Sequence, residues 1–303
     1  MEQDRPALGV LLMLGFCVVA PVGDAIAKVL GSRVPLGELL LVRFAIQALV
    51  LIPIVWLTKR AWRMNGRLLK LTAIRTILHV LGIGAMVTAL KYLPLAAAVA
   101  IAFVMPFIML LLGKYILHET VGHRRVIACI VGFIGTLMVI QPSFASVGWP
   151  ALWPLAVAFI FAFFMLVTRQ LARDTDPIGL QAVSGVMATV VLLPLIVVGH
   201  QLEWAILSFA VPTTLDVWLL LAIGLLGTLA HLLMTWSLRF APSATLAPMQ
   251  YLEIPVATLI GWLAFTDLPN GIASIGIGIT ICSGLYVIFS ERLDASAKME
   301  KIA

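Results

Sequence analysis

Residues 91–94 of this chain read Lys-Tyr-Leu-Pro, and residues 239–242, which lie 148 positions later, read Arg-Phe-Ala-Pro. Each stretch ends one long apolar run, and a second apolar run begins directly after its proline. Pro106 and Pro255 continue the match at an offset of 149. Further pairs fall at offsets between 141 and 149: Gly113 and Gly261, Glu119 and Asp267, Gly135 and Gly284, Pro35 and Pro177, and Pro53 and Pro194. An almost constant offset over so many positions indicates two copies of one structural unit.

The composition indicates that both copies lie in a membrane. Hydrophobic residues fill 62% of the 303 positions, charged residues fill 11%, and the mean hydropathy is +1.11. Soluble domains are roughly 45–50% apolar and about 25% charged, so a soluble globular protein is excluded. The apolar runs have about the length of a spanning helix and lack the alternation of membrane β-strands. We predict ten spanning helices: 7–28, 36–57, 73–90, 95–116, 125–141, 150–168, 178–199, 216–238, 244–265 and 271–290.

The predicted fold is therefore an all-α membrane protein with ten transmembrane helices in two inverted five-helix repeats. Because each copy has an odd number of spans, the second copy must enter the membrane from the opposite side. We expect the first repeat at 7–145, the second at 146–290 and a cytoplasmic tail at 291–303. Inverted repeats around a midplane site are an architecture of secondary transporters. The alternative is an old duplication that was kept only for packing.

The distribution of Lys and Arg predicts the orientation. With the N-terminus inside, 16 of the 20 basic residues fall on the cytoplasmic side and three fall outside. The loops 141–149 and 200–215, both predicted outside, contain no Lys or Arg. The first run follows Glu2, Asp4 and Arg5, so we interpret it as an uncleaved helix and not as a signal peptide. We expect a multi-pass protein of the bacterial inner membrane with both termini in the cytoplasm.

Motifs in both halves resemble the drug/metabolite transporter superfamily, in particular its EamA-type members. In the first half the resemblance rests on Arg43-Phe44, the stretch 89–98, Pro106, Glu119 and the glycines of 132–135. In the second half it rests on 238–242, Glu253-Ile254-Pro255 and Asp267, although Asp267 stands where glutamate is usual and no Arg-Phe pair lies near Gly185. The resemblance covers roughly 8–290 and implies a ten-helix carrier that exports small metabolites. Within the superfamily, YddG-type amino-acid exporters are similar in length and span pattern.

Ionisable residues within predicted spans are functional candidates because they are costly in lipid. Glu253 precedes the kinking Pro255 and could couple transport to protons or bind a substrate amine. Arg43 could bind a carboxylate, and the two could equally form a structural ion pair. Asp24 and Lys28 are one turn apart at the outer end of the first helix, where they could form a local pair; we interpret them as outer-gate or interfacial residues and assign neither a role in substrate binding.

His79 is the candidate for the polar contact to a substrate, because histidine can donate, accept or change charge near neutral pH. It shares one helical arc with Leu78, Gly82 and Met86. His231 in the second half is its near-counterpart, and a buried neutral imidazole would explain either residue equally well. The remaining candidates for a substrate cavity are aromatic and methionine side chains, which lipid-facing packing also explains: Phe103, Met105, Phe163, Trp236, Met249 and Tyr251.

Other function classes find little support. We expect no cofactor and no metal, because no phosphate-binding loop, dinucleotide fingerprint, HExxH, GxSxG or Cys/His cluster is present. The basic residues are scattered between apolar runs, so no nucleic-acid partner is expected. The partners are a small-molecule substrate and the lipid bilayer, in a monomer or a homodimer. The favoured cargo is a neutral or aromatic amino acid; alternatives are a purine, a cation, a drug or a nucleotide-sugar-like metabolite. A membrane-embedded lipid enzyme is the remote alternative.

Overall fold

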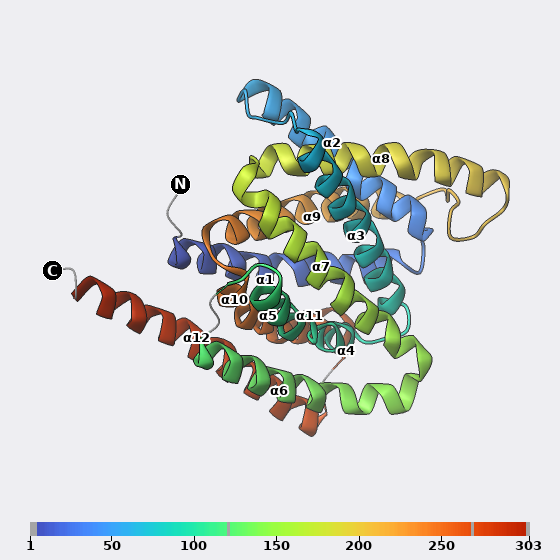
Figure 1. Ribbon diagram of the computed structural model, residues 1–303. Helices are drawn as coiled ribbons and strands as arrows, with labels where there is room; N and C mark the ends of the chain where they lie inside the picture. Colours follow the sequence, from blue (N-terminus) through green and yellow to red (C-terminus); the bar gives the residue numbers. More distant parts are fainter. Residues whose placement is uncertain (1–4, 120–121, 268–269, 301–303) are drawn as a thin grey trace.

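The computed structural model describes residues 5–119, 122–267 and 270–300, and every element in these ranges is a helix (Figure 1). The first half contains α1 (Pro6–Leu30), α2 (Leu36–Leu57), α3 (Gly66–Leu90), α4 (Leu95–Ala102), α5 (Met105–Tyr115) and α6 (His123–Val147). The second half contains η1 (Trp149–Ala151), α7 (Leu152–Asp174), α8 (Pro177–Gln201), α9 (Thr214–Phe240), α10 (Ser243–Leu246), η2 (Ala247–Leu252), α11 (Glu253–Phe265) and α12 (Gly271–Glu300). The expected tail at 291–303 is helical as far as Glu300, and its last three residues lie outside the described ranges.

Seven of these segments are long and apolar enough to cross a membrane: α1, α2, α3, α4 with α5, α7, α8 and α9. Three further helical stretches are also apolar but shorter, with 10–17 residues each: 126–138, 249–265 and 271–283. A helix satisfies all its backbone hydrogen bonds internally, which is why runs of this composition fold this way in lipid. The chain is thus a multi-pass helical membrane protein.

Two of the expected continuous helices, 95–116 and 244–265, are interrupted instead. The first ends at Ala102 and resumes at Met105, directly before Pro106. The second begins with α10, continues as the 3₁₀ segment η2 and returns to an α-helix at Glu253, two residues before Pro255. Proline lacks the N–H and its ring clashes with the carbonyl four residues earlier, so each break lies where that clash would fall. The breaks occupy equivalent positions in the two halves.

The main contacts between helices stay the same when each helix is replaced by its equivalent in the other half. The pair α2 and α8 forms one edge of the bundle, and the pair α6 and α12 forms the opposite edge (Figure 1). Between them α1 packs along α9, and α3 packs along α7. Exchanging the halves turns the first of these central pairs into the second and maps each edge pair onto itself. The contacts therefore have the approximate twofold relation that the sequence offset indicates.

Equivalent helices run antiparallel at both edges of the bundle. At the start of α2, Gly37 approaches Ile196 near the end of α8, whereas Gln47 further along donates to the carbonyl of Gln181 near the start of α8, at 2.7 Å. In the other edge pair Gly135 of α6 lies against the carbonyl of Gly276, and Ser283 donates back to Ala128 at 2.5 Å. Corresponding helices of the two halves thus point in opposite directions.

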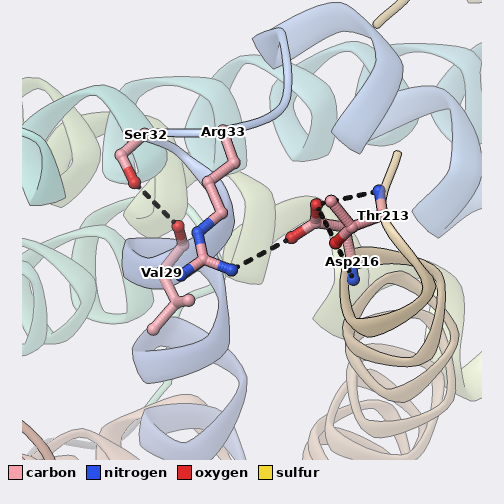
Figure 2. A network of polar contacts seen from close by, with 5 residues as sticks. All are labelled: Val29, Ser32, Arg33, Thr213 and Asp216. Atoms are coloured by element: carbon pink, nitrogen blue, oxygen red, sulfur yellow. Dashed lines mark hydrogen bonds and ion pairs between the residues drawn. The ribbon is translucent and has the colours of Figure 1, made fainter. Parts of the chain in front are cut away.

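The central helices α1 and α9 are also antiparallel. Near the start of α1, the carbonyl of Gly9 accepts a 2.7 Å hydrogen bond from Ser237 at the end of α9. Beyond the other end of α1, Arg33 contacts Asp216 in the first turn of α9, with 3.4 Å between Nη1 and Oδ1 (Figure 2). Asp216 also closes a capping box with Thr213, whose hydroxyl donates to it at 2.6 Å. These contacts fix both ends of α1 against the second half.

Candidate functional site

A cavity lies between the two halves of the bundle. Its walls come from α1, α2, α3, α4 and α5 of the first half and from α7, α9 and α11 of the second. It has about 80 Å³ of space for the centres of water-sized molecules. At about 10–15 Å³ per water, this space holds roughly five to eight waters. Most of the wall is apolar, and its phenylalanine and methionine side chains are Phe16, Met86, Phe103, Met105, Phe161 and Met165.

Three ionisable side chains interrupt this apolar wall: Asp24 from α1, Arg43 from α2 and Glu253 from α11. Arg43 is 9% exposed, Glu253 is 7% exposed and Asp24 is half-buried. Within the described ranges, no hydrogen bond or ion pair joins any of the three side chains to another residue. A buried charge normally has a partner, because removing it from water costs several kcal/mol or more. Two acids and one base therefore open into a single small space without protein partners.

Arg43 packs closely against α9 at Gly227, which has no side chain. A Cβ added at Gly227 would lie 2.7 Å from Cζ and 2.8 Å from Nε of Arg43, which is closer than real atoms approach. Gly227 thus provides the space in which the guanidinium packs. The sequence suggested an ion pair between Arg43 and Glu253; the structure brings both to one cavity and joins them by no ion pair.

Glu253 is positioned by the second helix break. It is the first residue of α11, where the chain changes from 3₁₀ to α-helix two residues before Pro255. The break therefore places an acid inside the helical bundle, at the point where the helix type changes.

The two candidate histidines form a pair. The Nε2 atoms of His79 and His231 are 2.9 Å apart, and Phe164 packs against both rings. Only His231 lines the cavity; His79 is fully buried behind it. One Nε2 must donate and the other must accept, so at most one ring can carry a positive charge. His79 thus contacts a residue of the cavity wall but does not line the cavity itself.

Arg75 lies one turn from His79 on α3 and is fully buried. Its Nε donates to Thr168 at 2.9 Å, its Nη1 donates to Ser184 at 3.0 Å, and its Cζ lies 4.7 Å from the ring centre of Phe164. The predicted third helix begins at residue 73, which would place Arg75 at its cytoplasmic end. Because α3 begins at Gly66, Arg75 lies more than two turns inside the helix.

The other candidates divide between the cavity and the packing around it. Met86, Phe103 and Met105 line the cavity. Gly82 lets α3 approach Phe161, a wall residue, because a Cβ there would lie 2.6 Å from its ring.

Five candidates lie away from this space. Leu78 and Trp236 are half-buried among other helices, and Phe163 is 43% exposed on the outer surface of α7. Met249 is buried, and its carbonyl accepts from the thiol of Cys17. The hydroxyl of Tyr251 donates to the carbonyl of Cys129 at 3.2 Å, which ties this residue to α6.

Asp24 is the site residue that sequence reasoning missed. Its spacing to Lys28 suggested a local ion pair, but Lys28 instead donates to the carbonyl of Leu93 at 2.9 Å and lies 3.6 Å from Asp267. A signal was present nevertheless, because Ala20, Gly23 and Ala27 form a small-residue arc on the same helix. Such an arc next to an acid indicates open space, and these residues line the cavity with Asp24.

Ion pairs between the two halves lie beyond the cavity in both directions. In the Glu119 cluster, Glu119 accepts from the hydroxyl of Ser243 at 2.6 Å and lies 3.4 Å from Arg169, which also donates to the carbonyl of Leu238 at the end of α9. In the Asp267 cluster, Asp267 contacts Lys28 near the end of α1. Since α1 and α9 are antiparallel, the two clusters lie at opposite ends of this helix pair.

Within the described part of the chain, no group of three or more His, Cys, Asp or Glu side chains could hold a metal ion. The chemistry that the cavity offers is therefore ionic and hydrogen-bonding recognition in an apolar surrounding.

Comparison with known proteins identifies the family. The family model for EamA-like transporters matches residues 7–141 and again 148–290. An S-adenosylmethionine uptake transporter of Rickettsia prowazekii is 23% identical over 96% of both chains. A riboflavin transporter of Rhizobium johnstonii is 31% identical over 72% of this chain and 69% of its own length. A protein of known crystal structure shares the fold with a TM-score of 0.72 at 18% identity, over 93% of this chain and 98% of its own. The chain belongs to the EamA-like transporter family, within the drug/metabolite transporter superfamily.

Proposed function

We propose that this protein is a secondary transporter that moves a small metabolite across the bacterial inner membrane by alternating access. In this proposal ten spans form two inverted repeats, both termini face the cytoplasm, and the two repeats rock about the cavity between them. The observation that carries the proposal is that cavity, since both repeats line it and three unpartnered ionisable side chains open into it. Membership of a transporter family supports the same conclusion.

The two inter-repeat clusters are suited to act as gates. Glu119 and Asp267 occupy equivalent positions, 148 residues apart, and each contacts a basic residue near the end of the first long helix of the other repeat. In the proposed orientation the Glu119 cluster closes the cytoplasmic side and the Asp267 cluster closes the outer side. Opening one while the other holds would expose the cavity to one side at a time, as alternating access requires.

The proposed cargo is a neutral or aromatic amino acid, or a metabolite that contains an amino-acid group. Aromatic and methionine walls suit an apolar side chain, and Asp24, Arg43 and Glu253 suit its charged end. S-adenosylmethionine, the cargo in the name of one relative, contains such a group. We propose export, because a carrier without an energy-supplying motif follows gradients and metabolites accumulate in the cytoplasm.

Counterflow in proteoliposomes tests the carrier. Vesicles that contain the purified protein and excess unlabelled phenylalanine are diluted into labelled phenylalanine, with parallel arms for S-adenosylmethionine and riboflavin. A carrier accumulates the label transiently above its equilibrium level, and Arg43→Gln loses this overshoot while Arg67→Gln, an exposed arginine on α3, retains it. Efflux from loaded vesicles then measures the direction. No overshoot in any arm would contradict the proposal.

A further inference from the structure

We propose that the cavity recognises a zwitterion: the ammonium group of an α-amino acid lies between Asp24 and Glu253, and its carboxylate lies on Arg43. This inference deepens the proposed function and rests on it, because it assigns the substrate class to that same cavity. The charges are contributed by different helices, α1 and α11 for the acids and α2 for the base. A ligand with both charges therefore bridges the two repeats.

The acidic side of the site needs a cation. Asp24 and Glu253 line the same cavity, and neither carboxyl group has a hydrogen-bond donor among the described residues. An ammonium group supplies three donors and one positive charge, which satisfies one carboxylate from each repeat at once. Within the membrane this compensation is stronger than in water, because the low dielectric increases the attraction between charges.

The basic side needs an anion. The guanidinium of Arg43 lies against the backbone at Gly227, so its position is fixed by packing and it attracts Asp24 without contacting it. A planar guanidinium binds a carboxylate through two parallel hydrogen bonds. His231 lies on the same wall, one helical turn from Gly227, and can donate or accept a further hydrogen bond. This side of the cavity thus matches a carboxylate in charge and geometry.

The size and the remaining wall complete the match. Room for roughly five to eight waters accommodates an amino-carboxylate head group. Beyond the charges the wall is formed by Phe16, Met86, Phe103 and Phe161, which suit an apolar side chain. The head group is therefore the part that is recognised by charge, and the side chain lies against this apolar wall.

Binding of matched analogues to the detergent-solubilised protein tests this assignment. The probes are phenylalanine, phenethylamine, which lacks the carboxylate, and 3-phenylpropanoate, which lacks the ammonium group; alanine and S-adenosylmethionine serve as further zwitterions. We expect wild-type protein to bind at least one zwitterion and to bind each phenylalanine analogue about tenfold or more weakly than phenylalanine, because each leaves a buried charge unpaired.

The variants assign each group to its partner. Arg43→Gln should lose the discrimination against phenethylamine but keep that against 3-phenylpropanoate, and Asp24→Asn should do the reverse. The exposed controls Arg67→Gln and Glu203→Gln should retain both. Because the analogue series is measured on wild-type protein, a misfolded variant does not remove the test.

Failure of this inference can be told apart from failure of the carrier. Binding of an analogue as tightly as phenylalanine, or no binding of any zwitterion, would overturn the zwitterion site. Counterflow of riboflavin without zwitterion binding would leave the carrier in place and overturn only this inference. Selective zwitterion binding without counterflow would support the site and contradict transport.

Discussion

A charged side chain inside an apolar bundle is stabilised either by a partner in the protein or by the molecule that the bundle binds. Arg75 belongs to the first kind, with Thr168, Ser184 and the ring of Phe164 around it. In our proposal Arg43 belongs to the second kind, because no described residue forms a hydrogen bond or ion pair with it. The two arginines are both buried, yet only the second opens into the cavity. This contrast separates structural from functional charge at the residue scale.

Gly227→Ala tests whether the position of the Arg43 guanidinium affects substrate binding. A methyl group 2.7 Å from Cζ must displace the guanidinium, so we expect substrate binding to weaken by about tenfold or more, as in Arg43→Gln. The matched control is Gly84→Ala on α3, where the nearest atom, Cδ1 of Leu40, lies at an ordinary 3.7 Å. Equilibrium binding of labelled substrate measures both. Unchanged affinity in Gly227→Ala would argue against a role for the position of Arg43.

The histidine pair makes a separate prediction about stability. His79→Ala leaves Nε2 of the buried His231 without its 2.9 Å partner, so the free energy of unfolding should fall by about 1–3 kcal/mol. His79→Gln keeps a hydrogen-bonding group and should recover part of the loss. Thermal unfolding in detergent compares the two variants. If both unfold at the wild-type temperature, the contact between the histidines is not stabilising.

At the scale of elements, the helix breaks position the functional groups. Glu253 lies directly at the second break, and Phe103 lies in the first, and both face the cavity. Discontinuous helices are used in this way by secondary transporters, where broken backbone lines a binding site. The prolines are visible in the sequence, but the helix breaks could not be predicted from them, because a proline can either kink a helix or end it.

Pro255→Ala should separate stability from function. Removing the ring restores an N–H and allows α11 to extend toward residue 249, which stabilises the helix by up to about 3 kcal/mol. The same change moves Glu253, so we expect counterflow to slow by about tenfold while the unfolding temperature rises. Hydrogen exchange across residues 249–255 reports the extension. A variant with faster exchange there and unchanged counterflow would contradict the role of the break.

At the scale of the whole molecule, the proposed transport cycle requires the two inter-repeat clusters to set the balance between conformations. Asp267→Asn weakens the outer cluster, and Glu119→Gln weakens the inner one, so their effects on the balance should be opposite. The pair of Lys28 and Asp267 is partly exposed, and such a pair contributes about 0.2–1 kcal/mol, which shifts the populations by up to about fivefold. The inner cluster also includes the 2.6 Å bond from Ser243, so its loss should have the larger effect.

Cysteine reactivity measures this shift. In a background without Cys17, Cys129 and Cys282, a single cysteine at the cavity residue Ala20 is labelled from outside with an impermeant maleimide. Asp267→Asn should increase the labelling rate, Glu119→Gln should decrease it, and Glu203→Gln should leave it unchanged. Equal rates in all variants would show that the clusters do not gate access.

Much of the fold could be predicted from the sequence, whereas the site could be predicted only in part. Length, hydropathy and the constant offset predict membrane helices in two repeats, because these features depend on the solvent and not on detailed packing. Which face of a helix points inward is harder to predict, because lipid is as apolar as the core of the bundle. Phe103 and Phe163 both lie in apolar runs of the sequence, yet Phe103 lines the cavity and Phe163 is exposed.

The orientation of the two repeats is the claim on which the account depends, and cysteine labelling in intact cells tests it most directly. Residues 91 and 239 lie at the ends of α3 and α9, the third long helix of each repeat, and are equivalent by the 148-residue offset. We expect an impermeant maleimide to label a single cysteine at position 91 in intact cells, and one at position 239 only after the inner membrane is permeabilised. Labelling of both positions from the same side would contradict inverted repeats and the alternating access built on them.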